Sequence, residues 1–210
     1  MLSRVEPADC LQFAGDGLVI ALGRQAPGAR EQAQDWVGRL RERGWDGDDE
    51  LADQIEARLG SGAAPMLRPL PVDLEELSSV LEGDPANGGG RIDLRTGEVW
   101  PDFVFENLEI DIDEKDDDHW LAVRCEGSRA GYRDMQRFVD TLPDPEQRDR
   151  LDRALRGRGA FRRFKDVLAG WPDDVTRWHS FSDERQRGRA RAWLADHGYA
   201  VAPRSARPTP

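Results

Sequence analysis

The sequence predicts an α+β fold in which a small antiparallel sheet packs on a mainly helical C-terminal half. Two observations carry this prediction. Residues 91–100 place two short strand-like segments around Arg95-Thr96-Gly97, which is typical of a β-hairpin, and residues 120–125 are predicted to form a third strand. From residue 128 onward, apolar side chains instead recur at intervals of three and four residues, as on one face of a helix.

The N-terminal region, residues 1–60, is predicted to open with a hairpin. Leu11–Phe13 and Leu18–Leu22 are short apolar segments, and Ala14-Gly15-Asp16-Gly17 lies between them. Glycine and aspartate favour tight turns, so this pattern favours two paired strands. We expect this region either to extend the main core or to form a satellite beside it.

Helix and loop signals give the rest of the predicted domain organisation. Two helices follow the hairpin, one ending at Gly44 and one spanning about residues 50–59. Residues 61–70 are predicted to be a linker because small residues and proline dominate their first half. Residues 71–202 form the main α+β domain, and 203–210 are a disordered tail.

The C-terminal half is predicted to consist of successive helices with a shared apolar core. Asp144-Pro145 is a typical helix start, Gly157 ends that helix, and another helix follows over about 159–169. Helical spacing then selects the side chains that face inward. The predicted core residues are Phe138, Leu151, Phe161, Phe164, Leu168, Trp178 and Trp193.

The composition predicts a soluble protein with a highly charged surface. Of 210 residues, 38% are hydrophobic, including seven tryptophans, which is enough for a core, while 34% are charged. No segment approaches the about 20 apolar residues that cross a bilayer, and the start lacks the apolar part of a signal peptide. The two cysteines, Cys10 and Cys125, lie far apart. We therefore expect a reducing bacterial cytoplasm, no membrane association and no cofactor.

The net charge of −11 conceals a strong asymmetry along the chain. Residues 148–191 contain thirteen Lys and Arg against seven Asp and Glu, a net of +6, so the remainder carries −17. The densest acidic segment is 109–118, with seven acids and one lysine. The basic segment could meet an anionic partner, or it could pair with the protein's own acidic segments.

Residues 155–168 combine two glycines, five cations and an apolar stripe. Arginines beside the start of a helix favour an anion site, because free backbone N–H groups and guanidinium groups both bind phosphate or carboxylate. Alternatively, Gly157 ends one helix, Gly159 permits a corner, and the arginines are solvated or paired with acids. The candidate anion- or partner-binding residues are Arg158, Arg162, Arg163 and Lys165.

The acidic segment supplies a candidate metal site formed by Asp111, Asp113 and His119. Carboxylate oxygens suit a hard cation, but Lys115 occupies a ligand position of the calcium-loop pattern and no glycine turn follows. The alternative is a solvated loop, which could neutralise the basic segment or imitate a phosphate backbone toward a basic partner.

The sequence contains no metalloprotease helix motif, nucleophile elbow, phosphate loop or dinucleotide fingerprint. We predict no catalytic residues, and the leading hypothesis is a non-enzymatic cytoplasmic binding or interaction protein with a protein or anionic partner. One alternative is an anion or nucleic-acid binder that uses the arginine-rich C-terminal helices, including Arg185, Arg187, Arg189 and Arg191. A second alternative is a metal-dependent hydrolase that uses the acidic segment.

Besides the acidic segment, four segments form a recognisable pattern: Val72–Leu77, Ile92–Val99, Gly157–Leu168 and Ala192–Gly198. Together they resemble a bacterial family known as uncharacterised protein family 0158. The resemblance covers about residues 71–202, and the Gly-Arg-Gly-Ala-Phe-Arg-Arg-Phe-Lys segment is its most specific part. It implies a fold but no catalytic residues, because the biochemistry of the family is not established.

Overall fold

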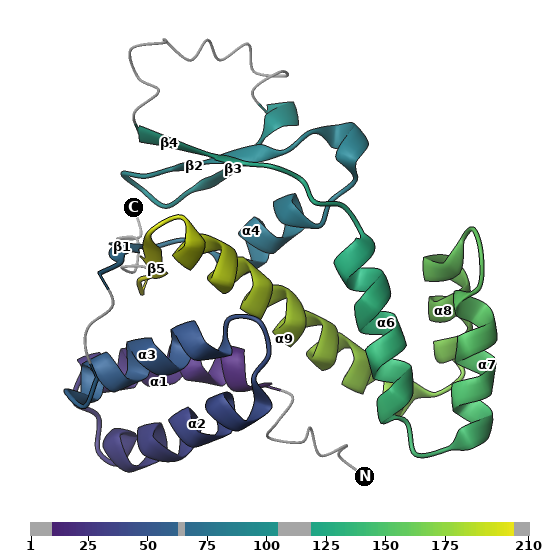
Figure 1. Cartoon of the computed structure of the whole chain (residues 1–210), viewed down its shortest axis with the longest axis horizontal. Coiled ribbons are helices and arrows are strands. Elements are labelled where there is room, and N and C mark those ends of the chain that lie inside the picture. The colour runs from purple at the N-terminus through teal and green to yellow at the C-terminus, as the bar shows by residue number, and fades with distance from the viewer. Residues whose placement is uncertain (1–9, 63–65, 105–118, 204–210) are drawn as a thin grey trace, which may run out of the picture.

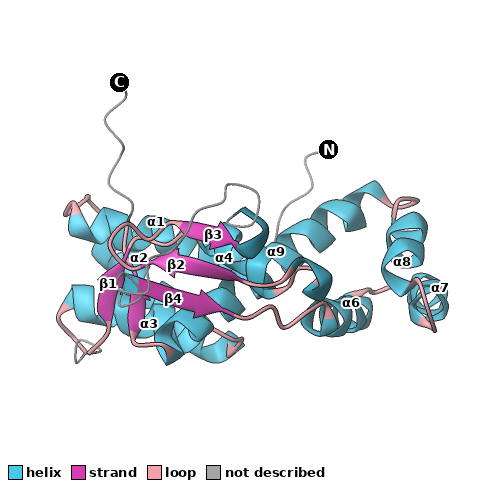
Figure 2. Cartoon of the chain, turned by 90° about the horizontal axis from the view of Figure 1, so that it is seen from above, coloured by secondary structure: helices cyan, strands magenta, loops and turns pink. Residues whose placement is uncertain are grey.

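A computed structural model of the chain describes residues 10–62, 66–104 and 119–203. The α+β prediction is confirmed. A long helix, α9 (Pro172–Asp196), runs through the middle of the molecule, and three groups of elements pack around it (Figure 1). Three N-terminal helices, a small sheet with a short helix, and three further helices form these groups, and the last of them lies at one end of the molecule (Figure 2).

The N-terminal group consists of α1 (Leu11–Gly23), α2 (Ala29–Arg43) and α3 (Asp48–Leu59). The two predicted helices are confirmed as α2 and α3, and Gly44 ends α2 in the left-handed conformation. The predicted hairpin is wrong, because its two segments belong to the single helix α1.

Packing explains why glycine occurs inside α1. A Cβ atom at Gly15 would lie 2.6 Å from the Leu51 side chain, so glycine lets α1 approach α3 closely. Glycine costs a helix about 1 kcal/mol relative to alanine, and the buried apolar face of α1 offsets that cost. The buried side chains of this face are Leu11, Leu18 and Val19.

The predicted sheet is confirmed as three antiparallel strands in the order β3-β2-β4. The strands are β2 (Gly90–Asp93), β3 (Val99–Pro101) and β4 (Trp120–Val123). Gly97 has a φ of +76° in the turn between β2 and β3, which glycine adopts without strain. Helix α4 (Leu74–Leu81) joins this sheet in one apolar core with the C-terminal part of α9.

A second, parallel pair of strands has no signal in the sequence. Strand β1 (Arg68–Leu70) pairs with β5 (Tyr199–Val201), so that Leu70 lies opposite Val201. The last three residues of the predicted linker therefore form a strand that pairs with the C-terminal end of the described chain. Each strand is too short to show an alternating pattern of its own.

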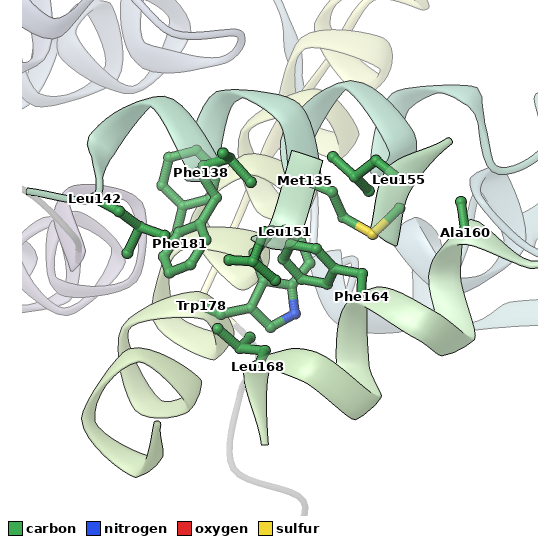
Figure 3. Close-up of a cluster of buried hydrophobic side chains, with 11 residues drawn as sticks. Met135, Phe138, Leu142, Leu151, Leu155, Ala160, Phe164, Leu168, Trp178 and Phe181 are labelled. Carbon is green, nitrogen blue, oxygen red and sulfur yellow. The ribbon is translucent and has the colours of Figure 1, made fainter. Parts of the chain in front are cut away.

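The remaining helices form the C-terminal group: α6 (Arg129–Thr141), α7 (Pro145–Leu155) and α8 (Ala160–Leu168). Their apolar faces meet α9 in a core of packed aromatic rings (Figure 3). The rings of Phe164 and Trp178 pack edge to face with centroids 4.9 Å apart. The predicted core residues confirmed as buried are Phe138, Leu151, Phe164, Leu168 and Trp178.

Two of the predicted core residues differ. The assignment of Phe161 is wrong, because its side chain is 38% exposed at the edge of α8, one residue beyond the buried stripe that begins at Ala160. Trp193 is half-buried: it packs against the core of the sheet and α4, and its ring stacks on His197 at 3.9 Å.

Backbone contact between Gly188 in α9 and the turn between α2 and α3 fixes the N-terminal group on α9. A Cβ atom at Gly188 would lie 2.0 Å from the carbonyl oxygen of Asp46. A Cβ atom at Gly47, where φ is +80°, would lie 2.2 Å from the carbonyl oxygen of Gly188. Neither position can accept a side chain without separating the two backbones.

Replacing Gly188 with alanine is therefore expected to destabilise the protein by about 1–3 kcal/mol, despite the higher helix propensity of alanine. Urea unfolding measures the change. The matched control is Gly38→Ala in α2, where a Cβ atom meets nothing within 4 Å and stability is expected to stay level or rise by up to about 1 kcal/mol. Equal stability of the two variants would contradict the close-contact account.

Candidate functional site

Four arginines of α9 form ion pairs with carboxylates from other elements. Arg185 lies 3.0 Å from Asp134 of α6 and 3.1 Å from Asp46. Arg189 lies 2.6 Å from Glu82 and 2.8 Å from Asp134, whereas Arg187 and Arg191 both pair with Asp16 of α1. This part of the predicted nucleic-acid surface is thus engaged inside the fold. The four arginines are Arg185, Arg187, Arg189 and Arg191.

Glu184 binds the beginning of α1 and is 3% exposed. Its carboxylate accepts hydrogen bonds from the backbone N–H groups of Gln12 at 2.7 Å and Phe13 at 2.9 Å. It also accepts one from Arg43 at 3.0 Å. A carboxylate from α9 therefore satisfies N–H groups that α1 leaves without an intrahelical partner.

A second buried carboxylate, Asp48, continues this network and is fully buried. Arg43 donates to both of its oxygens, at 2.7 and 2.9 Å, and the Gln12 side-chain amide donates at 2.8 Å. The Gln12 carbonyl oxygen in turn accepts from Nε of Arg191 at 2.8 Å. Buried polar groups thus connect α1, α2, α3 and α9 without a break.

The charged state of Arg43 is stabilised by its partners. Burial alone would lower the pKa of Arg43, but the hydrogen bonds and charges of Asp48 and Glu184 outweigh burial and hold this pKa above its ordinary value. The ring of Trp45 provides a further cation–π contact, with the guanidinium carbons of Arg43 and Arg185 at 4.3 and 5.0 Å from its centre.

Arg163, one of the predicted anion-binding residues, folds back onto the end of α7. Its guanidinium group donates to the backbone carbonyl oxygens of Ala154 at 3.1 Å and Arg156 at 2.6 Å, and also to that of Arg158. The last carbonyl groups of a helix have no intrahelical partner, so this arginine stabilises the turn between α7 and α8.

The other three predicted residues are exposed at the start of α8. Phe161, Arg162 and Lys165 lie on one face of α8, since residues four apart are neighbours on a helix, and Arg158 lies in the turn just before it. The Arg162 side chain is 90% exposed, and its pair with Asp166, at 3.8 Å, is a weak surface contact. We call these residues the cationic edge: Arg158, Phe161, Arg162 and Lys165.

The cationic edge lies at the end of the molecule, where α7 and α8 stand away from the sheet (Figure 1). No acidic residue occurs between Arg153 and Lys165. Phe161 lies near Gly131 of α6, where its ring would be 3.5 Å from an added Cβ atom. Three of the four predicted cations are therefore exposed, whereas Phe161 contributes an aromatic surface instead of the predicted core packing.

Two residues of the candidate metal site, Asp111 and Asp113, lie outside the described residues. The third, His119, is half-buried beside β4. Its carbonyl oxygen accepts a hydrogen bond from Leu94 at 2.8 Å, and its ring lies 5.1 Å from that of Trp120. In the described part of the chain, no group of three or more His, Cys, Asp or Glu is arranged to hold a metal ion.

The structure also reveals a groove between α1, α4 and α9. It consists of two hollows, with volumes of about 280 and 340 Å³, that share Phe13, Glu75 and Arg187 in their walls. We call this surface the α1–α9 groove. Sequence reasoning missed it because its walls come from three segments that are far apart along the chain.

Comparison with known proteins places this fold in a family. A model of the uncharacterised protein family UPF0158 matches residues 101–209, which include Gly157–Leu168 and Ala192–Gly198. The chain belongs to UPF0158. Its similarity to UPF0158 protein PA5073 of Pseudomonas aeruginosa amounts to 27% identity over 144 residues, which cover 66% of this chain and 90% of that protein. No solved structure matches this UPF0158 chain.

The family match begins later than the resemblance in the sequence suggested. The segments Val72–Leu77 and Ile92–Val99 precede residue 101, whereas the cationic edge and α9 lie within the match. None of the helices in the described part of this UPF0158 chain has both the length and the apolar composition needed to cross a bilayer.

Proposed function

We propose that this UPF0158 protein is a non-enzymatic interaction protein of the bacterial cytoplasm, and that its cationic edge binds an acidic surface of a partner protein. The contrast between two sets of cations carries the proposal. The α9 arginines and Arg163 are engaged in the fold, whereas Arg158, Arg162 and Lys165 are exposed. Exposed arginine beside an exposed aromatic ring is typical of the residues that dominate protein–protein binding energy.

The distribution of charge favours a protein partner over a nucleic acid. A long polyanion meets the field of the whole molecule, and the net charge of −11 repels it. An acidic patch on a folded protein contacts only the cationic edge and avoids most of that repulsion. Of the arginines that would widen the basic surface, Arg185 and Arg191 are buried, and Arg187 and Arg189 pair with carboxylates of the fold.

A cytoplasmic location agrees with the state of the cysteines. The two cysteines of the chain, Cys10 and Cys125, form no disulfide and are half-buried, as is typical of proteins from reducing compartments. The relative from Pseudomonas aeruginosa supports a bacterial setting.

The test is affinity capture from a bacterial extract, with proteins identified by mass spectrometry. The bait is the full chain or the variant R158E/R162E/K165E. The matched control is R24E/R68E/R124E, which changes the net charge equally at exposed arginines elsewhere. We expect the parent and the control to retain the same acidic protein, and the edge variant to lose it by about tenfold or more.

Two results would contradict the proposal. One is equal capture of that protein by the parent and the edge variant, which would place binding elsewhere. The other is capture of RNA by the parent that R158E/R162E/K165E abolishes and the control retains, which would favour the nucleic-acid alternative. Thermal unfolding of all three baits checks that each remains folded.

A further inference from the structure

We propose that the α1–α9 groove is a second binding site, which takes a segment of a partner protein that carries arginine or lysine beside large apolar side chains. This site lies on other elements than the cationic edge and has the opposite charge. The two proposals can therefore be tested independently.

The first hollow of the groove is acidic. Glu75 of α4 and Asp183 of α9 both lie in its wall. Neither carboxylate has a Lys or Arg nitrogen within 4 Å among the residues that the structure describes, in contrast to Asp16 and Glu184, which are both paired. These two groups leave a negative charge that the fold does not neutralise by direct contact.

The pKa of Asp183 is raised, as expected for a carboxylate whose charge is not neutralised. Partial burial raises its pKa, and the neighbouring charge of Glu75 raises it further, while His179 and Arg187 act in the opposite direction. The pKa of Asp183 is therefore above its ordinary value, which means that its environment disfavours the ionised carboxylate. A guanidinium or ammonium group placed between Glu75 and Asp183 would remove that cost.

The second hollow combines apolar side chains with the carboxylates of Asp16, Asp73 and Glu75. Side chains from the end of α1, the start of α4 and strand β5 form much of its wall. Phe13 stands between the two hollows with 68% of its surface exposed, and the guanidinium group of Arg187 lies 5.4 Å from its ring. The apolar lining consists of Val19, Ile20, Val72, Leu74, Val201 and Ala202.

The side-by-side arrangement of the two hollows indicates the chemistry of the ligand. A peptide that alternates basic and large apolar side chains can place a cation in the acidic hollow and an apolar group in the neighbouring one. Charge complementarity therefore selects a basic segment, and the apolar lining selects leucine-like neighbours.

The test uses three fluorescein-labelled hexapeptides and fluorescence anisotropy with the full chain. The basic apolar probe is Leu-Arg-Leu-Leu-Arg-Leu, the acidic probe replaces arginine with glutamate, and the polar probe replaces leucine with serine. We expect the parent to bind the basic apolar probe at least about tenfold more tightly than either of the others.

Variants locate the site. E75Q/D183N is expected to weaken binding of the basic apolar probe by about tenfold, and Phe13→Ala, at an exposed side chain, by at least about threefold. E146Q/D152N makes the same change of net charge on exposed residues of α7 and is expected to change the affinity less than about twofold. Circular dichroism confirms that each variant is folded.

The proposal is overturned if E75Q/D183N and E146Q/D152N bind the probe equally well. It is also overturned if the parent binds all three peptides alike. If R158E/R162E/K165E loses binding of the peptide and E75Q/D183N retains it, the peptide binds at the cationic edge. That result would also overturn the groove proposal.

Discussion

Replacing Glu184 with alanine is expected to lower the free energy of unfolding by about 3–5 kcal/mol, because it breaks a buried ion pair and leaves buried donors without an acceptor. The Arg43 side chain, which is 9% exposed, would lose this carboxylate partner and keep its pair with Asp48. The backbone N–H groups of Gln12 and Phe13 would also lose their acceptor at the start of α1. Urea unfolding followed by circular dichroism measures the change.

The control for this prediction is Asp152→Ala, which removes an exposed carboxylate from α7. We expect this variant to unfold within about 0.5 kcal/mol of the parent. A value for Glu184→Ala within about 1 kcal/mol of the parent would show that the buried network contributes little to the attachment of α1 on α9.

Replacing Phe164 with alanine is expected to cost about 3–5 kcal/mol, whereas the same change at Phe161 is expected to cost about 1 kcal/mol or less. Phe164 is fully buried, and its ring packs against Phe138 and Trp178 (Figure 3). Phe161 is only three residues away and is exposed. Both variants replace phenylalanine with alanine, so the difference between their losses of stability reflects the burial of the side chain.

Thermal unfolding monitored by tryptophan fluorescence reports on both variants, since Trp178 lies in the same core. Equal loss of stability in the two variants would restore the core role that the helical pattern of the sequence gave to Phe161. Equal retention of stability would mean that the aromatic core shown in Figure 3 is not the main core of the C-terminal group.

The elements that the sequence predicts correctly have strong local signals. Asp144 accepts a hydrogen bond from the backbone N–H of Glu146 and so caps the predicted start of α7. Capping depends on neighbouring residues, so one segment of sequence contains all the information that it needs.

The errors occur where the deciding contact is distant in the sequence. Gly15 is typical of a turn, but the side chain of Leu51 occupies the space beside it and favours a tightly packed helix. Strands β1 and β5 are three residues long, and their paired residues, such as Arg68 and Tyr199, lie far apart in the sequence. No local pattern contains that pairing.

The candidate site also has features set by neighbouring residues and features set by contacts that are distant in the sequence. The cationic edge was predictable because its residues follow one another along the chain. The role of Arg185 was not, since Asp46 and Asp134, which neutralise it, come from two other elements. Counting charges along residues 148–191 therefore overestimates the basic surface, because four of its arginines pair with carboxylates from other elements.

The charged groups of this UPF0158 protein form two classes: those paired inside the fold, such as Glu184 with Arg43 and Arg185 with Asp134, and the exposed cations of the cationic edge, which we propose bind a partner. Urea unfolding of Glu184→Ala and R158E/R162E/K165E, side by side with the parent, tests this division most directly. We expect the first to lose about 3–5 kcal/mol and the second to stay within about 1 kcal/mol of the parent. The opposite order, with the α8 variant destabilised and Glu184→Ala unaffected, would contradict the division.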